Sequence, residues 1–446
     1  MKVLWLCNVM IPMIAEQLNL EGTNKEGWIS GMADMVLKDR REHSVDLAVA
    51  FPAPRVMFLT GHDTFKRVLK LEDSTLTCYG FYEEVGRAEY YDRSLEGKLA
   101  EILEDAEPDI VHCFGTEYPH TLAMSRVIPD KKRLLIGIQG ICALYAEAYF
   151  SDLPEKVIKS VTLRDRLRRD SLVEQQQKFA RRGIMEKEAV LLAGNIAGRT
   201  EWDRSWTRSL NNNASYFNMN ETLRPEFYGQ KWDPDKCIPH SIFLSQGDYP
   251  IKGLHYMLLA MPAILSRYPD ATVYVAGNSI VGYRTLKQKL KISSYGKYLR
   301  KLMKENHLLD KVTFLGRLDV EQMLGRYLKS SLFVCCSSIE NSPNSLGEAM
   351  LLGMPCVTAD VGGIPSLFTD CEDGIMYKGF RIGEDSGKAL KNVSRHLAEA
   401  VIDMWSAPEK QELYCANARR HADKTHCRER NYVRLMEIYE EIVSET

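Results

Sequence analysis

Several features that assign many proteins to a class are absent from this sequence. There is no excess of one charge, because 58 Lys and Arg residues stand against 60 Asp and Glu residues, so we expect no nucleic-acid partner. There is no run of about 18 or more uncharged apolar residues, so we expect no membrane-spanning helix. The 11 cysteines are scattered without a C-x-x-C pair, which favours reduced thiols and a cytoplasmic location. No internal repeat or low-complexity tract is found.

The N-terminal stretch MKVLWLCNVMIPMIAEQ is not typical of a signal peptide. It carries one lysine, and its apolar run is interrupted at Asn8. We expect Lys2 to Cys7 to form a buried first strand.

The chain is long enough for two or three domains, because its 446 residues exceed what one hydrophobic core usually serves. Short apolar and β-branched runs alternate with helix-length segments in both halves, which predicts βαβ units and two doubly wound parallel sheets. The predicted strands lie at 3–7, 45–51, 109–114, 133–138, 190–195, 241–246, 272–277, 311–316, 331–337 and 355–359.

Between the two halves lies RPEFYGQKWDPDKCIPHS, which contains three prolines and no helical or alternating period, as in a linker. We therefore predict an N-terminal domain over 1–236 and a second domain over 237–405. A charged helical segment over 406–446 is predicted to pack on either domain. Two such domains facing each other would form a cleft at the carboxyl ends of their sheets, where open α/β folds bind ligands.

The segment SSIENSPNSLGEAMLLGMPCV carries two carboxylates eight positions apart, Glu340 and Glu348. We expect Asn344 to cap a helix that starts at Ser345 and ends before Gly353. The first N–H groups of a helix bind anions such as a diphosphate. Carboxylates accept hydrogen bonds from hydroxyls, so the two glutamates would suit a ribose on one side and a sugar on the other.

This E-x7-E pattern, followed by AMLLGMPCV, VGGIP at 361–365 and EDGIMY at 372–377, resembles the donor site of the retaining glycosyltransferases of the GT-B fold, family 4. The likeness continues upstream to SQGDYPIKGLHYMLLAMPAIL and covers nearly all of 240–380. In the first half, DIVHCFGTEYPH at 109–120 and NKEGWISGM at 24–32 resemble the family's loops. The resemblance implies two facing Rossmann-like domains with a cleft between them.

The resemblance also implies the role of each matching residue. Glu340 and Lys252 are the expected catalytic residues: Lys252 reaches the donor diphosphate, and Glu340 holds hydroxyls of the transferred sugar. Glu348 is expected to bind the ribose. The other expected donor contacts are Gly27 on the diphosphate, Asn344, Ser345, Leu346 and Gly347 on the phosphates, and Gly316, Arg317 and Leu318 at the base.

The mechanism that the family implies needs no protein nucleophile. The leaving group departs and the acceptor attacks on the same face, while a cation and helix N-termini stabilise the diphosphate. We therefore expect no metal and no cofactor, since the nucleotide sugar is a substrate.

Two positions depart from the family pattern. Many members have an arginine where this chain has Gly247, and a histidine where it has Gln139. Arg199 and Arg204 are candidates to supply the missing charge, since guanidinium groups suit phosphate oxygens. His112, Glu117 and His120 are further cleft candidates, with a core histidine as the alternative for His112.

The leading hypothesis is an enzyme of the hexosyltransferase type that moves a sugar from a nucleotide-diphosphate donor to a carbohydrate or lipid-linked acceptor, as in polysaccharide or glycoconjugate biosynthesis. Its predicted location is cytoplasmic. The basic segment 155–183 leaves open a peripheral contact with the inner face of the membrane. The alternatives are a degenerate GT-B protein that binds a partner enzyme without catalysis, and a sugar-nucleotide epimerase of the same fold.

Overall fold

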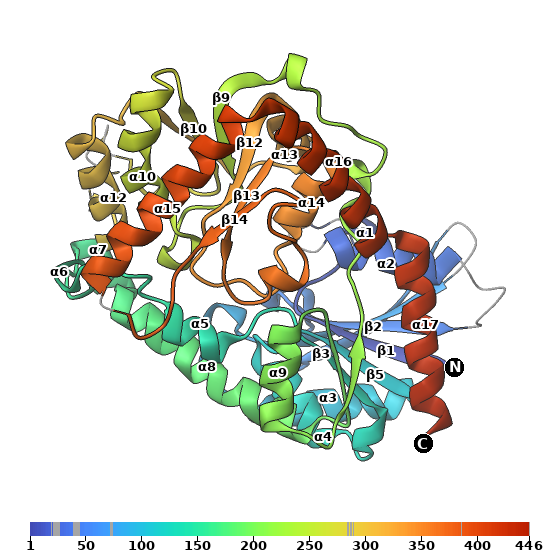
Figure 1. The fold of residues 1–446 in the computed structure, drawn as a ribbon. Helices are drawn as coiled ribbons and strands as arrows, with labels where there is room; N and C mark the ends of the chain where they lie inside the picture. The colour runs from blue at the N-terminus through green and yellow to red at the C-terminus, as the bar shows by residue number, and fades with distance from the viewer. Residues whose placement is uncertain are drawn as a thin grey trace. The chain divides into compact units, whose positions relative to one another are not determined.

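The structure, a computed structural model, describes the chain except residues 19, 21–26, 39–44, 72–74, 283–284, 286–287, 289, 385 and 446. Of residues 27 and 28 it describes the backbone. The chain forms two compact units, each with its own sheet (Figure 1). Unit 1 comprises Met1–Leu144, Lys178–Pro225 and His426–Thr446, and unit 2 comprises Tyr145–Gln177 and Glu226–Thr425.

Unit 1 is built on an eight-stranded sheet with the order β3-β4-β2-β1-β5-β6-β7-β8, in which only the β3–β4 pair is antiparallel. Its strands are β1 (Lys2–Cys7), β2 (Asp46–Ala53), β3 (Thr64–Lys70), β4 (Thr75–Tyr82), β5 (Ile110–Phe114), β6 (Leu134–Gly137), β7 (Asn195–Gly198) and β8 (Ser215–Asn218). Its helices include α1 (Pro12–Gln17), α2 (Gly27–Lys38), α3 (Ser94–Ala106), α4 (Pro119–Val127), α9 (Glu201–Leu210) and α17 (Arg428–Ser444).

The core of unit 1 lies on both faces of this sheet. In β1, Val3, Trp5 and Cys7 belong to one buried cluster, while Leu4 and Leu6 belong to the cluster on the other face. Successive side chains of a strand point to opposite faces, so a strand covered on both sides reads as a continuous apolar run. This explains why the first strand was predicted with its correct bounds.

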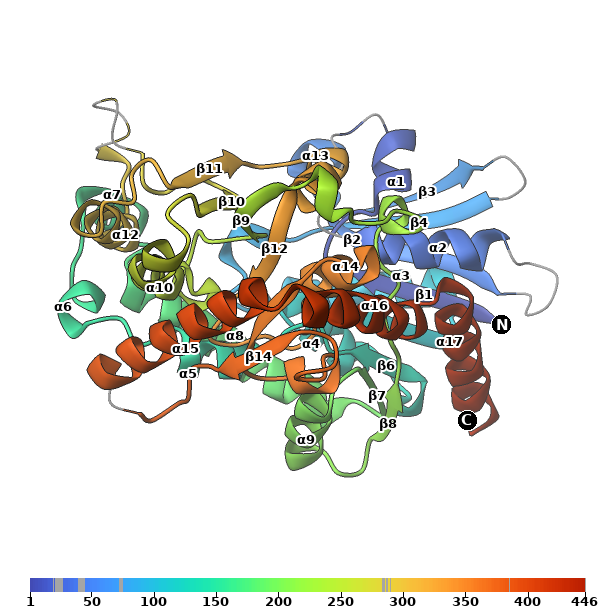
Figure 2. The same ribbon diagram turned by 45° about the horizontal axis from the view of Figure 1, so that its top comes forward.

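Helix α17 packs on unit 1, although it ends the chain. Its Tyr439 is fully buried, and the hydroxyl accepts a hydrogen bond from Trp5 Nε1 at 2.8 Å. The same hydroxyl lies 2.8 Å from Nδ1 of His112 in β5. The segment 406–446, which was predicted to pack on either domain, is therefore shared between the two units. Its helix α17 packs in unit 1, whereas α16 (Pro408–Thr425) packs against α14 (Asn344–Leu352) of unit 2. Figure 2 shows α15, α16 and α17 one after another along the chain.

Unit 2 is built on a six-stranded sheet with the order β11-β10-β9-β12-β13-β14, in which every pair is parallel. Its strands are β9 (Ile238–Leu244), β10 (Thr272–Ala276), β11 (Val312–Gly316), β12 (Ser330–Cys335), β13 (Cys356–Asp360) and β14 (Ile375–Lys378). Its helices include α6 (Glu155–Ile158), α7 (Leu163–Arg168), α10 (Leu254–Arg267), α12 (Ser294–Glu305), α13 (Val320–Lys329), α14 (Asn344–Leu352) and α15 (Ser386–Ser406).

A segment from the first half of the sequence, 145–177, packs with unit 2. The hydroxyls of Ser151 and Ser338 are 2.6 Å apart, and His255 Nε2 lies 2.8 Å from the Ser151 carbonyl oxygen. Helices α5 (Cys142–Ala148) and α8 (Leu172–Leu192) therefore each have one end in either unit. The units differ from the boundaries predicted from the sequence, because these contacts join residues about 100 or more positions apart.

One predicted strand was wrong, because the segment 190–195 contains the end of α8, and β7 begins only at Asn195. Four strands were not predicted, namely β3, β4, β8 and β14. Of these, β3 is the antiparallel strand at the edge of the unit 1 sheet. Within the described residues, no helix is long and apolar enough to cross a membrane.

The contacts of Tyr439 lead to a prediction about stability. We expect Tyr439→Phe to lower the free energy of unfolding by about 1–3 kcal/mol, because it leaves the buried Trp5 N–H without an acceptor. Urea denaturation followed by fluorescence measures this. The control is Tyr90→Phe, since Tyr90 is half exposed. An equal small change in both variants would contradict a structural role for Tyr439.

Candidate functional site

The E-x7-E segment forms a loop and a helix at the carboxyl end of β12. Helix α14 begins at Asn344, its N-cap is Pro343, and no side chain caps it. The predicted cap by Asn344 was therefore wrong: within the described residues, its buried Oδ1 has no hydrogen-bond partner. Leu346 and Gly347 donate the first intrahelical bonds to the Pro343 carbonyl. The helix N-terminus thus has no side-chain acceptor of its own, which suits an external anion.

The carboxylate of Glu340 lies against the ammonium group of Lys252. Lys252 ends a short 3₁₀ turn, η7 (Pro250–Lys252), and its Nζ is 2.5 Å from Glu340 Oε1. The Ser337 hydroxyl donates to the same oxygen at 2.7 Å. The Lys252 side chain is 20% exposed and that of Glu340 is 9% exposed. Burial disfavours the ammonium form, but the Glu340 carboxylate outweighs it and holds the pKa of Lys252 well above its ordinary value.

Glycines allow the chain segments around this ion pair to approach closely. Gly253 has φ +71°, and a Cβ there would lie 1.8 Å from the Cys336 carbonyl oxygen. Gly362 has φ +55°, and a Cβ there would lie 2.0 Å from the Glu340 carbonyl oxygen. That oxygen accepts a hydrogen bond from the Gly363 N–H at 2.9 Å. Only glycine fits such positions without strain, so the K-G and V-G-G motifs position the ion pair.

Glu348 lies on α14 and is almost fully buried, with 3% exposure. Its Oε2 accepts a hydrogen bond from the Tyr327 hydroxyl at 3.3 Å, and that hydroxyl also donates to the Ser345 carbonyl at 3.0 Å. Tyr327 is itself packed against Phe243 and Phe333. The tyrosine thus orients the carboxylate. No sequence signal pointed to it, since it comes from α13.

The residues predicted to border the base lie at the end of β11, beside the end of β10. Gly316 ends β11 with φ +79°, and its carbonyl accepts a hydrogen bond from the Gly277 N–H at 2.9 Å. Arg317 is exposed and donates to Asn278 Oδ1 at 3.2 Å, and Leu318 is partly buried. All described strand pairs of unit 2 are parallel, so the carboxyl ends of its strands lie on the same side of the sheet. The three base residues, Lys252 and Glu340 are all found on this side.

Gly247 is buried, and the side chains packed around it leave no room for the arginine that many family members have at this position. A Cβ at this position would lie 2.8 Å from Val275 Cγ1 and 2.9 Å from Leu254 Cδ2. A larger side chain would have to displace both.

In unit 1, His112 is a core residue. Its side chain is fully buried, stacks on Phe114 with ring centroids 3.9 Å apart and contacts Tyr439. Burial lowers the pKa of His112 to about 3, so the imidazole is neutral. The alternative interpretation of His112, as a core histidine, is therefore the one that its surroundings support.

Glu117 and His120 meet in a polar network of unit 1. His120 Nδ1 lies 2.6 Å from Glu83 Oε2, and its Nε2 lies 3.0 Å from Asn8 Oδ1. The Asn8 amide donates to Glu117 Oε2 at 3.1 Å, and Glu117 Oε1 accepts from the Gly140 N–H at 3.0 Å. Asn8 and Glu83 were not predicted. In the sequence, the interruption of the apolar run at Asn8 is the feature that could have pointed to Asn8 as a site residue.

Arg199 and Arg204 are already engaged within unit 1. Arg199 is buried, forms an ion pair with Glu221, and donates to the Ile138 carbonyl at 2.6 Å and to Gln139 Oε1 at 3.4 Å. Arg204 pairs with Glu201 at 3.0 Å and is 39% exposed. Arg204 is therefore the more accessible of the two guanidinium groups.

Gly27 and Glu186 are two further residues of interest in unit 1. Gly27 is the first residue of α2, while the loop before it lies outside the described residues. Glu186 on α8 was not predicted: it is fully buried and accepts hydrogen bonds from the Thr116 hydroxyl and from the N–H groups of Cys142 and Ala143. Burial raises the pKa of Glu186 to about 8. Among the described residues, no group of three His, Cys, Asp or Glu could hold a metal ion.

A comparison with known proteins finds a family model that matches most of unit 2 after residue 238. Residues 239–420 match the model described as glycosyl transferases group 1. This match covers less than half of the chain, and it shows that this part of unit 2 is similar to the glycosyltransferases of that group. The region contains Lys252, Glu340 and Glu348.

The curated relatives of this chain are distant. It is 28% identical over 193 residues to spore coat protein SA of Bacillus subtilis, which covers 43% of this chain and 46% of that protein. It is 26% identical over 162 residues to phosphatidyl-myo-inositol mannosyltransferase of Propionibacterium freudenreichii, covering 36% of this chain and 35% of that protein. The matched region thus spans less than half of either relative.

Solved structures resemble the whole chain. Sucrose-phosphate synthase from Thermosynechococcus elongatus has a TM-score of 0.66 at 13% identity, with 100% of both chains covered. HepE from Anabaena in complex with UDP-glucose has a TM-score of 0.62 at 15% identity, also with 100% of both chains covered. At such identities the likeness concerns the fold. It confirms the predicted class, a GT-B protein with two Rossmann-like α/β units.

The missing cap of α14 can be tested by mutation. We expect Asn344→Ala to change the free energy of unfolding by less than about 0.5 kcal/mol, because the side chain makes no capping bond. The matched control is Asp319→Ala, which removes the N-cap of α13 and its capping box and should cost about 1 kcal/mol. Chemical denaturation of both variants measures the difference. An equal cost would mean that Asn344 does cap α14.

Proposed function

We propose that this protein is a retaining glycosyltransferase of family 4 that transfers a sugar from a nucleotide-diphosphate donor to a carbohydrate or lipid-linked acceptor. The observation that carries the proposal is the Lys252–Glu340 ion pair, positioned by glycines beside the loop that leads to an uncapped helix. Glu348, held by Tyr327, lies on that same helix. Polysaccharide or glycoconjugate biosynthesis is the corresponding process.

The charges of the site suit the departure of a diphosphate. In the transfer, the bond between the anomeric carbon and the diphosphate oxygen breaks, and its electron pair remains on the diphosphate. Lys252 and the N-terminus of α14 stabilise that developing charge. The acceptor oxygen bonds to the anomeric carbon on the same face, and its proton passes to the leaving phosphate. Glu340 then accepts hydrogen bonds from the sugar hydroxyls, and Glu348 accepts them from the ribose.

The ion pair prepares Lys252 for this role. With no donor present, Glu340 keeps the lysine charged. A bound diphosphate would give the ammonium group a second acceptor and leave the outer lone pairs of Glu340 for the sugar. Because Gly247 contributes no charge, removing Lys252 should remove most of the cationic stabilisation of the leaving group in unit 2.

Relatives support the substrate class. One curated relative is named as a mannosyltransferase, and solved neighbours were captured with UDP-glucose or with UDP and a sugar. We propose a nucleotide sugar as the donor of this chain, and we assign acceptor recognition to unit 1. We also propose a cytoplasmic location, with peripheral contact at the inner face of the membrane.

Removing the ion pair as a unit tests the proposal. The double variant Lys252→Met with Glu340→Gln leaves no lone buried charge, which a single substitution would do. We expect kcat to fall by at least about 10²-fold, as is typical when a group that stabilises transition-state charge is lost. The measurement is nucleoside diphosphate release with a panel of donors and acceptors. The matched control is Lys410→Met with Glu412→Gln on exposed positions of α16, which should retain full activity.

The product distinguishes the alternatives. We expect the anomeric configuration of the donor to be kept, as read by NMR of the new linkage. Inversion would contradict the retaining mechanism. Nucleotide binding without release would favour the non-catalytic alternative, and conversion of the donor sugar without release would favour an epimerase.

A further inference from the structure

Unit 2 contains a cavity of about 610 Å³ that no donor-site residue lines. It lies between α6 and α12, and its apolar lining includes Val157, Ile292 and Tyr298. Val157 and Ile292 are each 8% exposed, so they belong to the packed part of the unit. The cavity therefore has a fixed apolar wall.

The rim of the cavity is basic. It carries Lys156 from α6, and Lys297, Arg300, Lys301 and Lys304 from α12. The four α12 positions follow the spacing i, i+3, i+4 and i+7, which places them on one face of the helix. Among the described lining residues, Glu305 is the acidic one, and it pairs with Lys301 at 3.4 Å. The charge of the rim is thus complementary to an anion.

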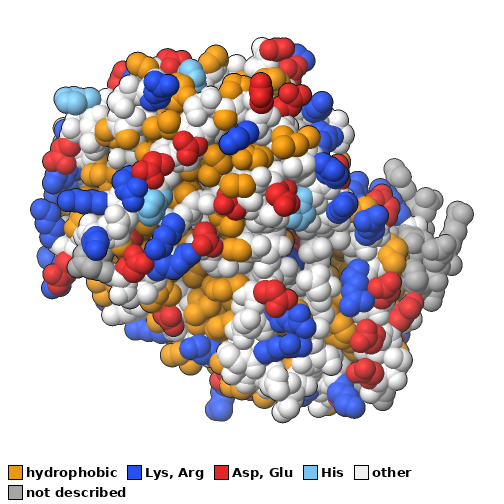
Figure 3. All heavy atoms as spheres, viewed as in Figure 1, with side chains coloured by type: hydrophobic (Ala, Val, Ile, Leu, Met, Phe, Trp, Pro, Cys, Tyr) orange, Lys and Arg blue, Asp and Glu red, His pale blue; other side chains and the backbone are white. Residues whose placement is uncertain are grey.

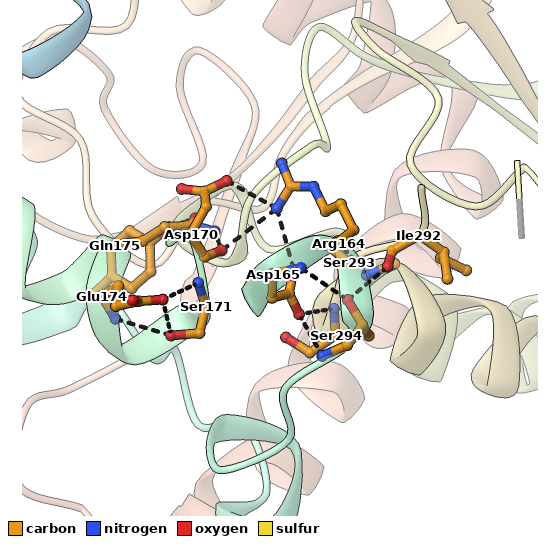
Figure 4. A network of polar contacts seen from close by, with 12 residues as sticks. Arg164, Asp165, Asp170, Ser171, Glu174, Gln175, Ile292, Ser293 and Ser294 are labelled. Atoms are coloured by element: carbon orange, nitrogen blue, oxygen red, sulfur yellow. Dashed lines mark hydrogen bonds and ion pairs between the residues drawn. The ribbon is translucent and has the colours of Figure 1, made fainter. Parts of the chain in front are cut away.

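A buried network holds the α6–α7 segment against α12 (Figure 4). The fully buried Asp165 accepts hydrogen bonds through Oδ2 from the Ser294 N–H at 2.9 Å and from the Thr162 N–H at 3.0 Å. The Thr162 hydroxyl donates to the Ile292 carbonyl at 2.9 Å, and Arg164 bridges Asp165 and Asp170 at 3.1 and 2.8 Å. The two walls of the cavity are therefore fixed relative to each other.

Large apolar side chains are exposed on the same segment. Val161, Leu163 and Leu167 are 54%, 57% and 76% exposed, and Arg166 and Arg168 beside them are exposed too. Figure 3 shows Lys and Arg side chains gathered along the edge of unit 2 where Figure 1 shows α6, α7 and α12. Exposed apolar residues among cations are typical of surfaces that lie at a membrane interface.

We infer that the α6–α12 cavity binds the headgroup region of an anionic phospholipid at a membrane surface. The lipid phosphate contacts the lysine rim, and the glycerol and first acyl carbons contact Val157, Ile292 and Tyr298. Leu163 and Leu167 enter the interface. The inference rests on the peripheral membrane contact of the proposed function and names its surface, which lies on the donor unit.

Vesicle binding tests the inference without any sugar nucleotide, so it can fail independently of the transferase assignment. The full chain is sedimented with vesicles of phosphatidylcholine alone or with about 30 mol% phosphatidylglycerol, at low and high salt. We expect binding only to the anionic vesicles, weakened by salt. Equal binding to both vesicle types, or binding to neither, would overturn the inference.

Three variants locate the contact. Lys297→Glu with Lys304→Glu reverses two exposed rim charges and leaves the Lys301–Glu305 pair intact, and we expect at least about a tenfold loss of vesicle affinity. Ser160→Trp fills the cavity without a charge change, and it should also weaken binding. The matched control is Lys391→Glu with Lys410→Glu on exposed positions of α15 and α16, which should bind like the wild type.

The remaining outcomes are decisive as well. A control variant that loses as much affinity as the rim variant would show a general charge effect and refute the cavity. Binding of inorganic pyrophosphate by calorimetry, lost in the rim variant and unaccompanied by vesicle binding, would assign the cavity to a soluble anion instead. Circular dichroism melts check that each variant is folded, and the rim variant decides the matter should Ser160→Trp not fold.

Discussion

The contact between Lys252 and Glu340 is the constraint on which the arrangement of unit 2 depends. It joins residues 88 positions apart in the sequence, one after β9 and the other after β12. A larger residue at Gly253 would meet the Cys336 carbonyl oxygen at the end of β12, and a larger residue at Gly362, in the loop after β13, would meet the Glu340 carbonyl oxygen. The glycines of two separate motifs thus have one physical purpose, the close placement of an ammonium group and a carboxylate at the edge of a parallel sheet.

This placement explains why the site needs few charged groups. A single ammonium group is held in its charged form by its carboxylate partner, and the uncapped N-terminus of α14 adds a partial positive charge. In the proposed function, both act on the same ligand group, a diphosphate. The packing around Gly247 shows that the missing arginine is part of the architecture of this chain, since Val275 and Leu254 occupy the space.

The sequence predicted the parts of this structure that depend on local pattern. The bounds of β1 follow from an unbroken apolar run. Spacing and resemblance singled out Lys252, Glu340 and Glu348, and their roles stay predictions. Contacts between distant segments carried no such signal. The packing of 145–177 with unit 2, the hydrogen bond from Tyr327 to Glu348 and the burial of His112 beneath Tyr439 each depend on residues far apart in the chain. The N-cap of α14 was predicted at the wrong residue. Asn344 is of a type that often caps helices, but it lies one position after the actual N-cap, Pro343.

The most direct test of the central claim is calorimetric titration of UDP, GDP, ADP and CDP into the wild type and into Glu348→Gln. We expect at least one of the four nucleotides to bind, and we expect the variant to bind it at least about tenfold more weakly, because a buried hydrogen-bond acceptor for the ribose is weakened. Binding unchanged in Glu348→Gln, or no binding of any of the four nucleotides, would contradict the assignment of this edge of unit 2 as a nucleotide-sugar site.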